Sequence, residues 1–234
     1  MRKVFAVMLC GVMLAAVWSV PAFAEYWNEG NSGDSWETAY VIDSVSDFMQ
    51  MSSRGYQETG KYYKLTADLD LTNEDLRHGG VMLTGHFDGQ DHTITISLNT
   101  SNSVYYSASL FSQASNIPIT IRNLKAAGTV RANEVAGGII EMLKNGVIEN
   151  CSFTGTVEAV RNVDDNIVVW AGGIAGHLGG YDSIAENHAP IIRNCTFSGT
   201  IRSSGINNGD SGGIAADISN GRIENSAQYS QAQA

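Results

Sequence analysis

Cysteine, basic residues and long apolar runs are scarce in this 234-residue chain, and each scarcity excludes a class of protein. Three cysteines are too few for a disulfide-rich scaffold. The chain has 14 Lys and Arg against 24 Asp and Glu, without an evident basic patch, which argues against nucleic acid or an anionic membrane as the partner. Beyond residue 24 no apolar stretch is long enough to cross a bilayer, so we expect no integral membrane segment in the mature chain.

Residues 1–24 have the pattern of a cleaved export signal. Arg2 and Lys3 precede an apolar run, and the small residues Ala22 and Ala24 form an A-x-A-like cleavage site before Glu25. The run is a little short for a spanning helix, although an uncleaved N-terminal anchor is the alternative. Without Arg2 and Lys3, 12 basic residues remain against 24 acidic ones, a net charge of −12. We therefore expect a secreted or cell-surface protein with one large domain.

Two kinds of sequence block alternate along the chain, and this alternation indicates a repeat protein. Blocks of the first kind read IRNLKAAGTV, IENCSFTGTV, IIRNCTFSGTI and RIENSAQYS, from Ile121, Ile148, Ile191 and Arg222. Blocks of the second kind read AGGIIEML, AGGIAGHL and SGGIAADI, from Ala136, Ala171 and Ser211. In the first three of these blocks the Asn-to-Gly spacing is 5 residues each time, whereas the links between the two kinds span 9, 17 and 13 residues. Fixed blocks joined by variable links predict a regular scaffold that carries loops.

The fixed blocks have the period of β-strands. Cys151, Phe153 and Val157 alternate with Ser152 and Thr154, and the block after Asn194 repeats this pattern. No tight hairpin dipeptide joins the blocks, so the simplest arrangement stacks equivalent strands in parallel. The sequence therefore predicts an all-β fold, a right-handed parallel β-helix.

Several residue types recur at one position of the repeat and should stack in ladders. Four asparagines are expected at a corner, where each amide can bond the amide of the next coil: Asn123, Asn150, Asn194 and Asn225. Two charged positions alternate in sign from coil to coil, namely Arg122, Glu149, Arg193 and Glu224, and Arg131, Glu158 and Arg202. The glycine pairs lack the Lys of a phosphate loop, so we expect them to permit tight corners or close coil packing.

Cys151 and Cys195 also share one repeat position. Stacked strands would hold their Cα atoms about 5 Å apart, which lies inside the range for a disulfide, although parallel strands hold the Cβ atoms almost as far apart. A disulfide and a pair of stacked core thiols therefore both remain open.

The two ends of the stack differ in sequence. Ser44 to Arg54 has helical spacing, and Ser44 with Asp47 fits a capping box, which predicts a helix over the first coil. A strand is expected from Tyr62 to Leu71. After Asn225 only nine residues follow, without an amphipathic helix. Either this open edge pairs end to end with another copy, a partner or further coils, or the polar tail folds across it. We divide the chain into a signal (1–24), a cap with the first coils (25–100) and the repeats (101–234), with cap and repeats forming one continuous domain.

The chain resembles secreted bacterial β-helix proteins with GLUG-type repeats. The resemblance depends on the segments WETAYVI from Trp36, KYYKLTADLDL from Lys61, HFDGQDHTI from His86 and AGGIAG from Ala171. It covers nearly the whole mature chain, except that SASLFSQAS from Ser107 lacks the paired glycines. It implies a surface or adhesin-like protein and is specific for the fold rather than for the function.

Candidate site residues cluster in the variable links and insertions. Asp164 and Asp165, which have Arg161 close to them in sequence, lie in a link equivalent to that of Asp210, and the three acids could form the carboxylate cluster of a polysaccharide lyase or a metal site. The alternative is a set of solvated loop acids. Trp170 and Tyr181 flank the insertions of one coil and could stack sugars or anchor a protein. His177 and His188 have no metal-ligand spacing, and we expect no cofactor and no metal.

These observations favour a non-catalytic binding or adhesion module outside the cell, with a glycan or protein ligand. A carbohydrate-active enzyme on a β-helix is the first alternative, and a structural stalk segment is the second. The variable links on the coil that contains Trp170 distinguish these functions, because binding or catalysis would concentrate there and a stalk would not need them.

Overall fold

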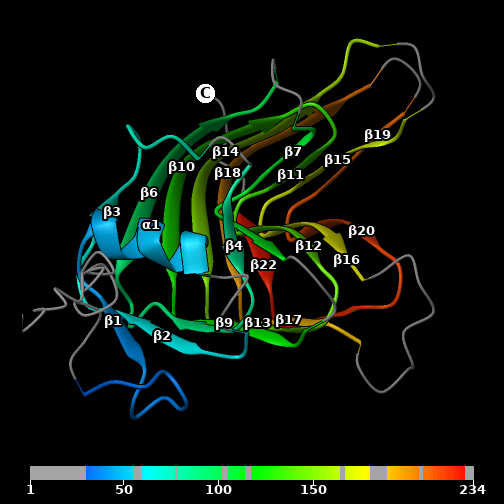
Figure 1. Cartoon of the computed structure of the whole chain (residues 1–234). Helices are drawn as coiled ribbons and strands as arrows, with labels where there is room; N and C mark the ends of the chain where they lie inside the picture. Colours follow the sequence, from blue (N-terminus) through cyan, green and yellow to red (C-terminus); the bar gives the residue numbers. More distant parts are fainter. Residues whose placement is uncertain are drawn as a thin grey trace, which may run out of the picture.

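The structure is a computed structural model that describes residues 30–54, 59–76, 79–101, 105–113, 117–163, 167–179, 189–205 and 208–229. In this part of the chain all strands pair in parallel and build four sheets, with one helix at the N-terminal end (Figure 1). The predicted parallel β-helix is therefore confirmed. The predicted export signal lies outside the described residues. Within them, no helix has the length and apolarity that a membrane span requires.

From β5 onwards each complete coil passes through four sheets, here lettered A to D, in the order A, B, D, C, whereas the described residues of the coil from β2 to β4 form no strand in sheet D. Sheet A contains β1 (Tyr40–Ile42), β2 (Tyr62–Leu65), β5 (His86–Asp88), β9 (Ile119–Arg122), β13 (Gly146–Glu149), β17 (Ile191–Arg193) and β21 (Arg222–Glu224). Sheet B contains β3 (Leu69–Asp70), β6 (Thr93–Asn99), β10 (Lys125–Ala132), β14 (Ser152–Val160), β18 (Thr196–Ser204) and β22 (Ala227–Tyr229). Sheet D contains β7 (Ser107–Ala108), β11 (Val135–Gly137), β15 (Val169–Gly172) and β19 (Gly209–Gly212). Sheet C contains β4 (Val81–Leu83), β8 (Phe111–Gln113), β12 (Ile140–Leu143), β16 (Ala175–Leu178) and β20 (Ala215–Ile218).

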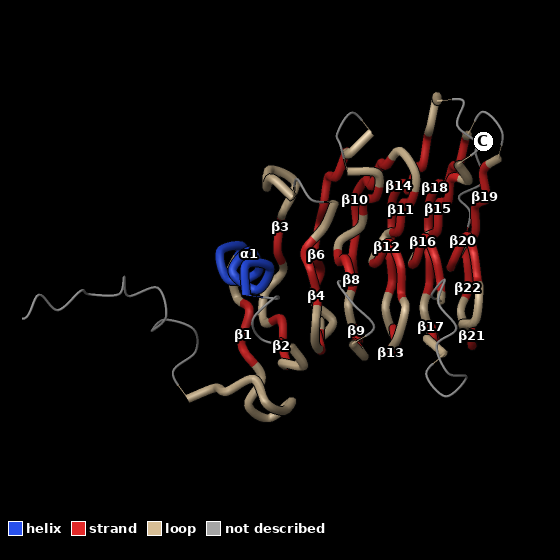
Figure 2. Tube along the Cα trace, turned by 45° about the vertical axis from the view of Figure 1, so that its right-hand side comes forward, coloured by secondary structure: helices blue, strands red, loops and turns tan. Residues whose placement is uncertain are grey.

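The helix α1 (Val45–Arg54) covers the N-terminal end of the stack, as the sequence predicts (Figure 2). The backbone N–H of Asp47 donates to Oγ of Ser44 at 3.2 Å, and Ser44 Oγ donates to the Asp47 carboxylate at 2.6 Å, which confirms the capping box. Phe48 is fully buried, with its ring centroid 6.1 Å from that of Phe87 and 5.8 Å from that of Phe111. The apolar end of the first coils is thus shielded from water.

The predicted strand from Tyr62 to Leu71 is wrong in one respect, because the chain turns a corner within it. Residues 62–65 join sheet A and residues 69–70 join sheet B. At the corner the carboxylate of Asp68 accepts a bond from the backbone N–H of Thr93 at 2.8 Å, which ties the turn to the next coil. Leu65 and Leu69 are both buried although they belong to different sheets, so the apolar pattern of the sequence continues through the corner.

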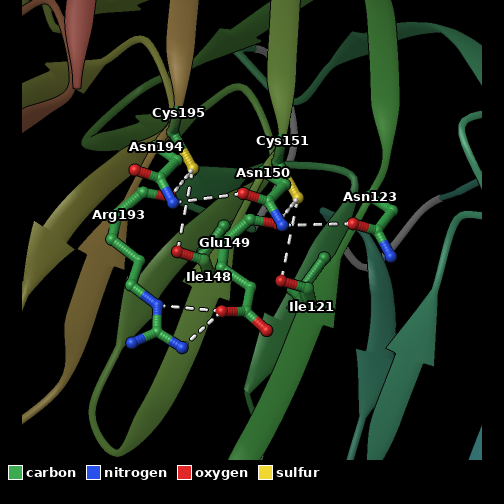
Figure 3. A network of polar contacts seen from close by, with 9 residues as sticks. All are labelled: Ile121, Asn123, Ile148, Glu149, Asn150, Cys151, Arg193, Asn194 and Cys195. Carbon is green, nitrogen blue, oxygen red and sulfur yellow. Dashed lines mark hydrogen bonds and ion pairs between the residues drawn. The ribbon is translucent and has the colours of Figure 1, made fainter. Parts of the chain in front are cut away.

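The asparagine ladder is present, and its members have left-handed backbone conformations. The φ angles of Asn123, Asn150, Asn194 and Asn225 lie between 45° and 53°. Nδ2 of Asn150 donates to Oδ1 of Asn123 at 3.3 Å, and Nδ2 of Asn194 donates to Oδ1 of Asn150 at 3.2 Å (Figure 3). Asparagine tolerates this conformation better than most residues, and its amide bonds both neighbouring coils.

The alternating charges also stand in register, as predicted. Glu149 pairs with Arg122 on one side and with Arg193 on the other, and Glu158 pairs with Arg131 and Arg202. Their contacts are not uniform. Nε of Arg193 donates to Oε2 of Glu149 at 2.8 Å, whereas Nε of Arg122 donates to Oδ2 of the buried Asp88 at 2.8 Å. Asp88 is the register partner of Arg122 on the preceding coil, so the alternation of charge extends one coil further than predicted.

Cys151 and Cys195 occupy equivalent positions and are free, buried thiols. Each Sγ donates to a carbonyl of its own coil, Cys151 to Glu149 O at 3.2 Å and Cys195 to Arg193 O at 3.3 Å (Figure 3). Burial raises the pKa of the Cys151 thiol. Of the two alternatives that the sequence leaves open, the structure contains the stacked thiols.

Glycine allows backbones to approach where side chains would collide. A Cβ on Gly155, whose φ is +146°, would lie 1.9 Å from the carbonyl oxygen of Gly128. A Cβ on Gly138, from a glycine pair, would lie 2.2 Å from the carbonyl oxygen of Gly173 and 2.6 Å from the ring of Phe153. The predicted close coil packing is confirmed, and it leaves room for the parallel rings of Phe153 and Phe197, which stack 6.2 Å apart.

The last coil replaces apolar core positions by polar ones. Gln228 is the register partner of Phe197 and is exposed, and Ser226 stands where the preceding coil has Cys195. Two large apolar side chains of this coil are still exposed to solvent, Ile218 by 48% and Tyr229 by 60%. End-to-end self-association at this coil stays a prediction.

Candidate functional site

Parallel strands of sheet B bring the starts of several variable links to one edge of the stack. Strands β6, β10 and β14 lie side by side in register, and each is followed by a link that leads into sheet D. Because the strands run in the same direction, these links project from the same side. The sequence predicts this convergence, and Figure 1 shows the loops gathered beyond the ends of β10, β14 and β18.

Three of these links form a pocket of about 430 Å³, which we call the arginine pocket. Its lining comes from coils far apart in sequence: Ser101, Tyr106, Arg131, Asn133, Val160, Arg161, Asn162 and Val163. Among the described residues the lining holds two arginines and no carboxylate. Pockets of a few hundred cubic ångströms suit small ligands or single sugar units.

Tyr106 and Arg161 form one wall of the arginine pocket. The guanidinium carbon of Arg161 lies 5.5 Å from the centroid of the Tyr106 ring, which is within cation–π range. The carbonyl of Tyr106 accepts a bond from Glu134 N–H at 2.8 Å, and the N–H of Arg161 donates to Ser204 O at 2.9 Å. The backbone of both residues is therefore fixed to other coils, while the Tyr106 side chain stays 53% exposed.

Arg131 supplies the second cation and is only partly neutralised. Its Nη1 lies 3.4 Å from Oε2 of Glu158, its register partner. This distance is long for a charge-assisted hydrogen bond. The Nε atom is buried and has no hydrogen-bond partner among the described residues, although the side chain as a whole is 43% exposed. The guanidinium can therefore still bind an anion.

A second pocket of about 420 Å³ adjoins the first and differs from it in charge. We call it the acidic pocket; it is lined by Glu74, Asp75, Leu76, Ser97, Leu98, Asn99, Thr100 and Tyr105. Asn99 and Thr100 directly precede Ser101 of the arginine pocket, and Tyr105 directly precedes Tyr106. Each pocket thus has its own tyrosine, and the two pockets meet along one stretch of chain.

The residues that the sequence singles out lie in different places. Asp164, Asp165 and Tyr181 are outside the described residues. Asp210 is exposed on β19 and is the register partner of Trp170 on β15. Trp170 lies on a strand rather than on a loop, and its ring centroid is 5.2 Å from that of His177. Among the described residues no group of three His, Cys, Asp or Glu could hold a metal ion.

The environment of His177 has the order of a Ser–His–acid arrangement. Its Nδ1 lies 2.8 Å from Oδ2 of Asp217, and its Nε2 lies 3.2 Å from Oγ of Ser219. Burial lowers the pKa of His177, against the opposing effect of Asp217, so the ring is neutral near neutral pH. The side chain of His177 is, however, 0% exposed. Nε2 of His177 approaches the Ser219 hydroxyl, but a catalytic histidine must also donate its proton to the leaving group, and a fully buried imidazole does not reach one.

Sequence reasoning missed most of the arginine pocket. It treated Arg131 as a ladder charge and Arg161 only as a residue near two acids, and it gave Tyr106 and Asn133 no role. The signal that could have found them is positional. All of them lie at or just beyond the ends of equivalent strands, or just before the start of β7, so aligned repeats place them at one edge.

Comparisons with known proteins agree with this fold. Residues 171–202 match the GLUG motif. A solved structure, a candidate immunoglobulin A1 protease from Bacteroides ovatus, is similar to the chain with a TM-score of 0.59 and 25% sequence identity. The match covers 85% of this chain and 59% of that structure. Among curated proteins no sequence matches significantly. The chain is therefore a parallel β-helix that carries a GLUG motif.

Proposed function

We propose that this protein is a non-catalytic binding module that acts outside the cell and captures glycans at the arginine pocket. The observation that carries the proposal is the lining of that pocket, which combines one exposed tyrosine, two arginines and two asparagines. A tyrosine ring offers a flat apolar face for a sugar, while amides and guanidinium groups bond its hydroxyls. Rigid strands hold these links in place, which favours binding by limiting the ordering that a ligand must impose.

A glycan explains the geometry better than a large protein partner does. The two pockets are small, concave and adjacent, and each contains a tyrosine. Successive sugar units could occupy successive pockets. A protein interface instead buries a broad surface of about 800 Å² on each partner.

A glycan-binding screen of the purified protein tests the proposal. Tyr106→Ala should weaken capture about tenfold, as expected for a residue at the centre of a binding site. Tyr229→Ala is the matched control, because that tyrosine is also highly exposed but lies on β22. Failure to bind any glycan, or equal loss with both variants, would overturn the proposal.

The enzyme alternative is tested on the same samples. The similar Bacteroides ovatus structure is named a candidate protease, and β-helices can carry carbohydrate-cleaving sites. A reducing-end assay on uronic-acid polymers and a protease assay on immunoglobulin A1 should both give background rates. Turnover in either assay that Tyr106→Ala abolishes would favour an enzyme.

A further inference from the structure

We propose that the arginine pocket selects a sugar unit that carries a carboxylate, and that the adjacent acidic pocket takes a neutral unit of the same glycan. This inference rests on the proposed function and names the ligand class of that site. The first observation is the charge of the described lining residues. In one pocket they include two arginines and no carboxylate, whereas in the other they include Glu74 and Asp75.

Arg131 is the residue best placed to bind the carboxylate. A guanidinium presents several donors in one plane and matches a carboxylate with two parallel hydrogen bonds. Oε2 of Glu158 lies 3.4 Å from Nη1 of Arg131, which is a long contact, and the side chain is 43% exposed, so the outer N–H groups of the guanidinium are accessible to a ligand. Arg161 adds a second positive charge to the lining and holds its guanidinium over Tyr106.

The acidic pocket limits which acidic glycans fit. Asn99 and Thr100 line the acidic pocket and the next residue, Ser101, lines the arginine pocket, so the two pockets share this segment of chain. A polymer with a carboxylate on every unit that reached from one pocket into the other would bring a carboxylate towards Glu74 and Asp75. Like charges repel one another in a site partly shielded from water. The pair of pockets therefore favours an isolated acidic unit beside a neutral one.

Three ligands of matched length test this selectivity by titration calorimetry. They are a neutral oligosaccharide, the same oligosaccharide with one terminal carboxylate-bearing sugar, and an oligouronate. We expect the singly acidic ligand to bind about tenfold more tightly than the other two, the gain expected from one charge-assisted bond. Its affinity should fall with salt, while that of the neutral ligand should not.

Substitutions in the pocket assign the effect to residues. Arg131→Gln should remove most of the preference for the acidic ligand and leave the affinity for the neutral one unchanged. Arg202→Gln is the matched control, because Arg202 holds the same ladder position relative to Glu158 but does not line the pocket. Glu158→Gln frees Arg131 from its competing carboxylate and should tighten binding of the acidic ligand. A misfolded variant would bind more weakly, so an increase in affinity cannot be explained by misfolding.

The outcomes separate the two proposals. Equal binding of the neutral and singly acidic ligands, with loss in Tyr106→Ala but not in Arg131→Gln, would overturn the carboxylate inference and leave the glycan function standing. Stronger binding of the oligouronate would also overturn it. Capture of a glutamate-rich peptide without any saccharide would overturn both.

Discussion

Asn150 has two separable roles in the corner ladder, and a pair of substitutions can measure each. Its φ of +53° is a left-handed conformation, and its amide bonds both neighbours, Asn123 at 3.3 Å and Asn194 at 3.2 Å. Asn150→Gly keeps the conformation accessible and removes the two bonds. Asn150→Ala removes the bonds and also forces a Cβ-bearing residue into the left-handed region.

The expected losses follow from these contacts. Asn150 is exposed, so each amide bond contributes at the low end of the usual range, about 0.5 kcal/mol. Asn150→Gly should therefore lower the free energy of unfolding by about 1 kcal/mol. Left-handed alanine costs about 1–2 kcal/mol more, so Asn150→Ala should cost about 2–3 kcal/mol in total.

Urea unfolding followed by circular dichroism measures both losses. The control is Asn225→Gly at the last rung, where the described residues include no side-chain bond to Asn194 and the loss should be well under that of Asn150→Gly. Equal losses for Asn150→Gly and Asn150→Ala would refute the conformational argument. Equal losses for Asn150→Gly and Asn225→Gly would refute the contribution of the amide ladder.

Other predictions follow from single contacts. Gly155→Ala would place a Cβ 1.9 Å from the Gly128 carbonyl oxygen and should cost about 3 kcal/mol or more, whereas Thr154→Ala next to it should cost little; similar melting temperatures for the two variants would contradict the close coil packing. Burial raises the pKa of Glu141 to about 7, so its folded form holds a proton that the unfolded form loses above about 4.5. Stability should therefore fall as pH rises between these values, and Glu141→Gln should stabilise at pH 8 but not at pH 4, as thermal melts can check. Glu149→Arg would replace the bond to Arg193 by repulsion and should lower the Tm more at low than at high salt; an unchanged Tm at low salt would refute the register. A fluorophosphonate probe should leave Ser219 unlabelled, and labelling that His177→Ala abolishes would establish a reactive serine.

The ladders could be predicted from sequence because each rung repeats the same local chemistry. Asn123 and Asn150, or Glu149 and Arg193, stand a fixed number of residues from the same glycine, so equal position along the repeat means adjacency in space. The capping helix was predictable for a similar reason, since Ser44 and Asp47 interact within one turn. In both cases the determining contacts are either local or periodic.

Most of the contacts that sequence reasoning missed do not follow from the repeat. Arg122 is an exception, because it bonds Asp88, its register partner on the preceding coil, whose buried carboxylate requires a cation. Trp170 on β15 meets His177 on β16 across the glycine pair that separates these strands. The arginine pocket joins Tyr106, Arg131 and Arg161 from three links of different length. No repeat unit encodes such a combination, so alignment of the repeats cannot reveal it.

The difference between ladder residues and residues of the variable links indicates which positions can change to alter ligand specificity. A ladder residue faces equivalent residues on both sides, so a substitution disturbs two contacts and lowers the stability of the fold. A residue in a variable link has no equivalent in the next coil and can change with little cost. Arg131 lies at the boundary between these regions, because it belongs to the Glu158 ladder and also lines the pocket. A guanidinium has five N–H donors, and the contact of Arg131 with Glu158 is long, so this residue can keep its place in the ladder and still donate to a ligand. We therefore expect ligand specificity to depend on residues such as Arg131, which stand at the end of a ladder strand and are only weakly paired there.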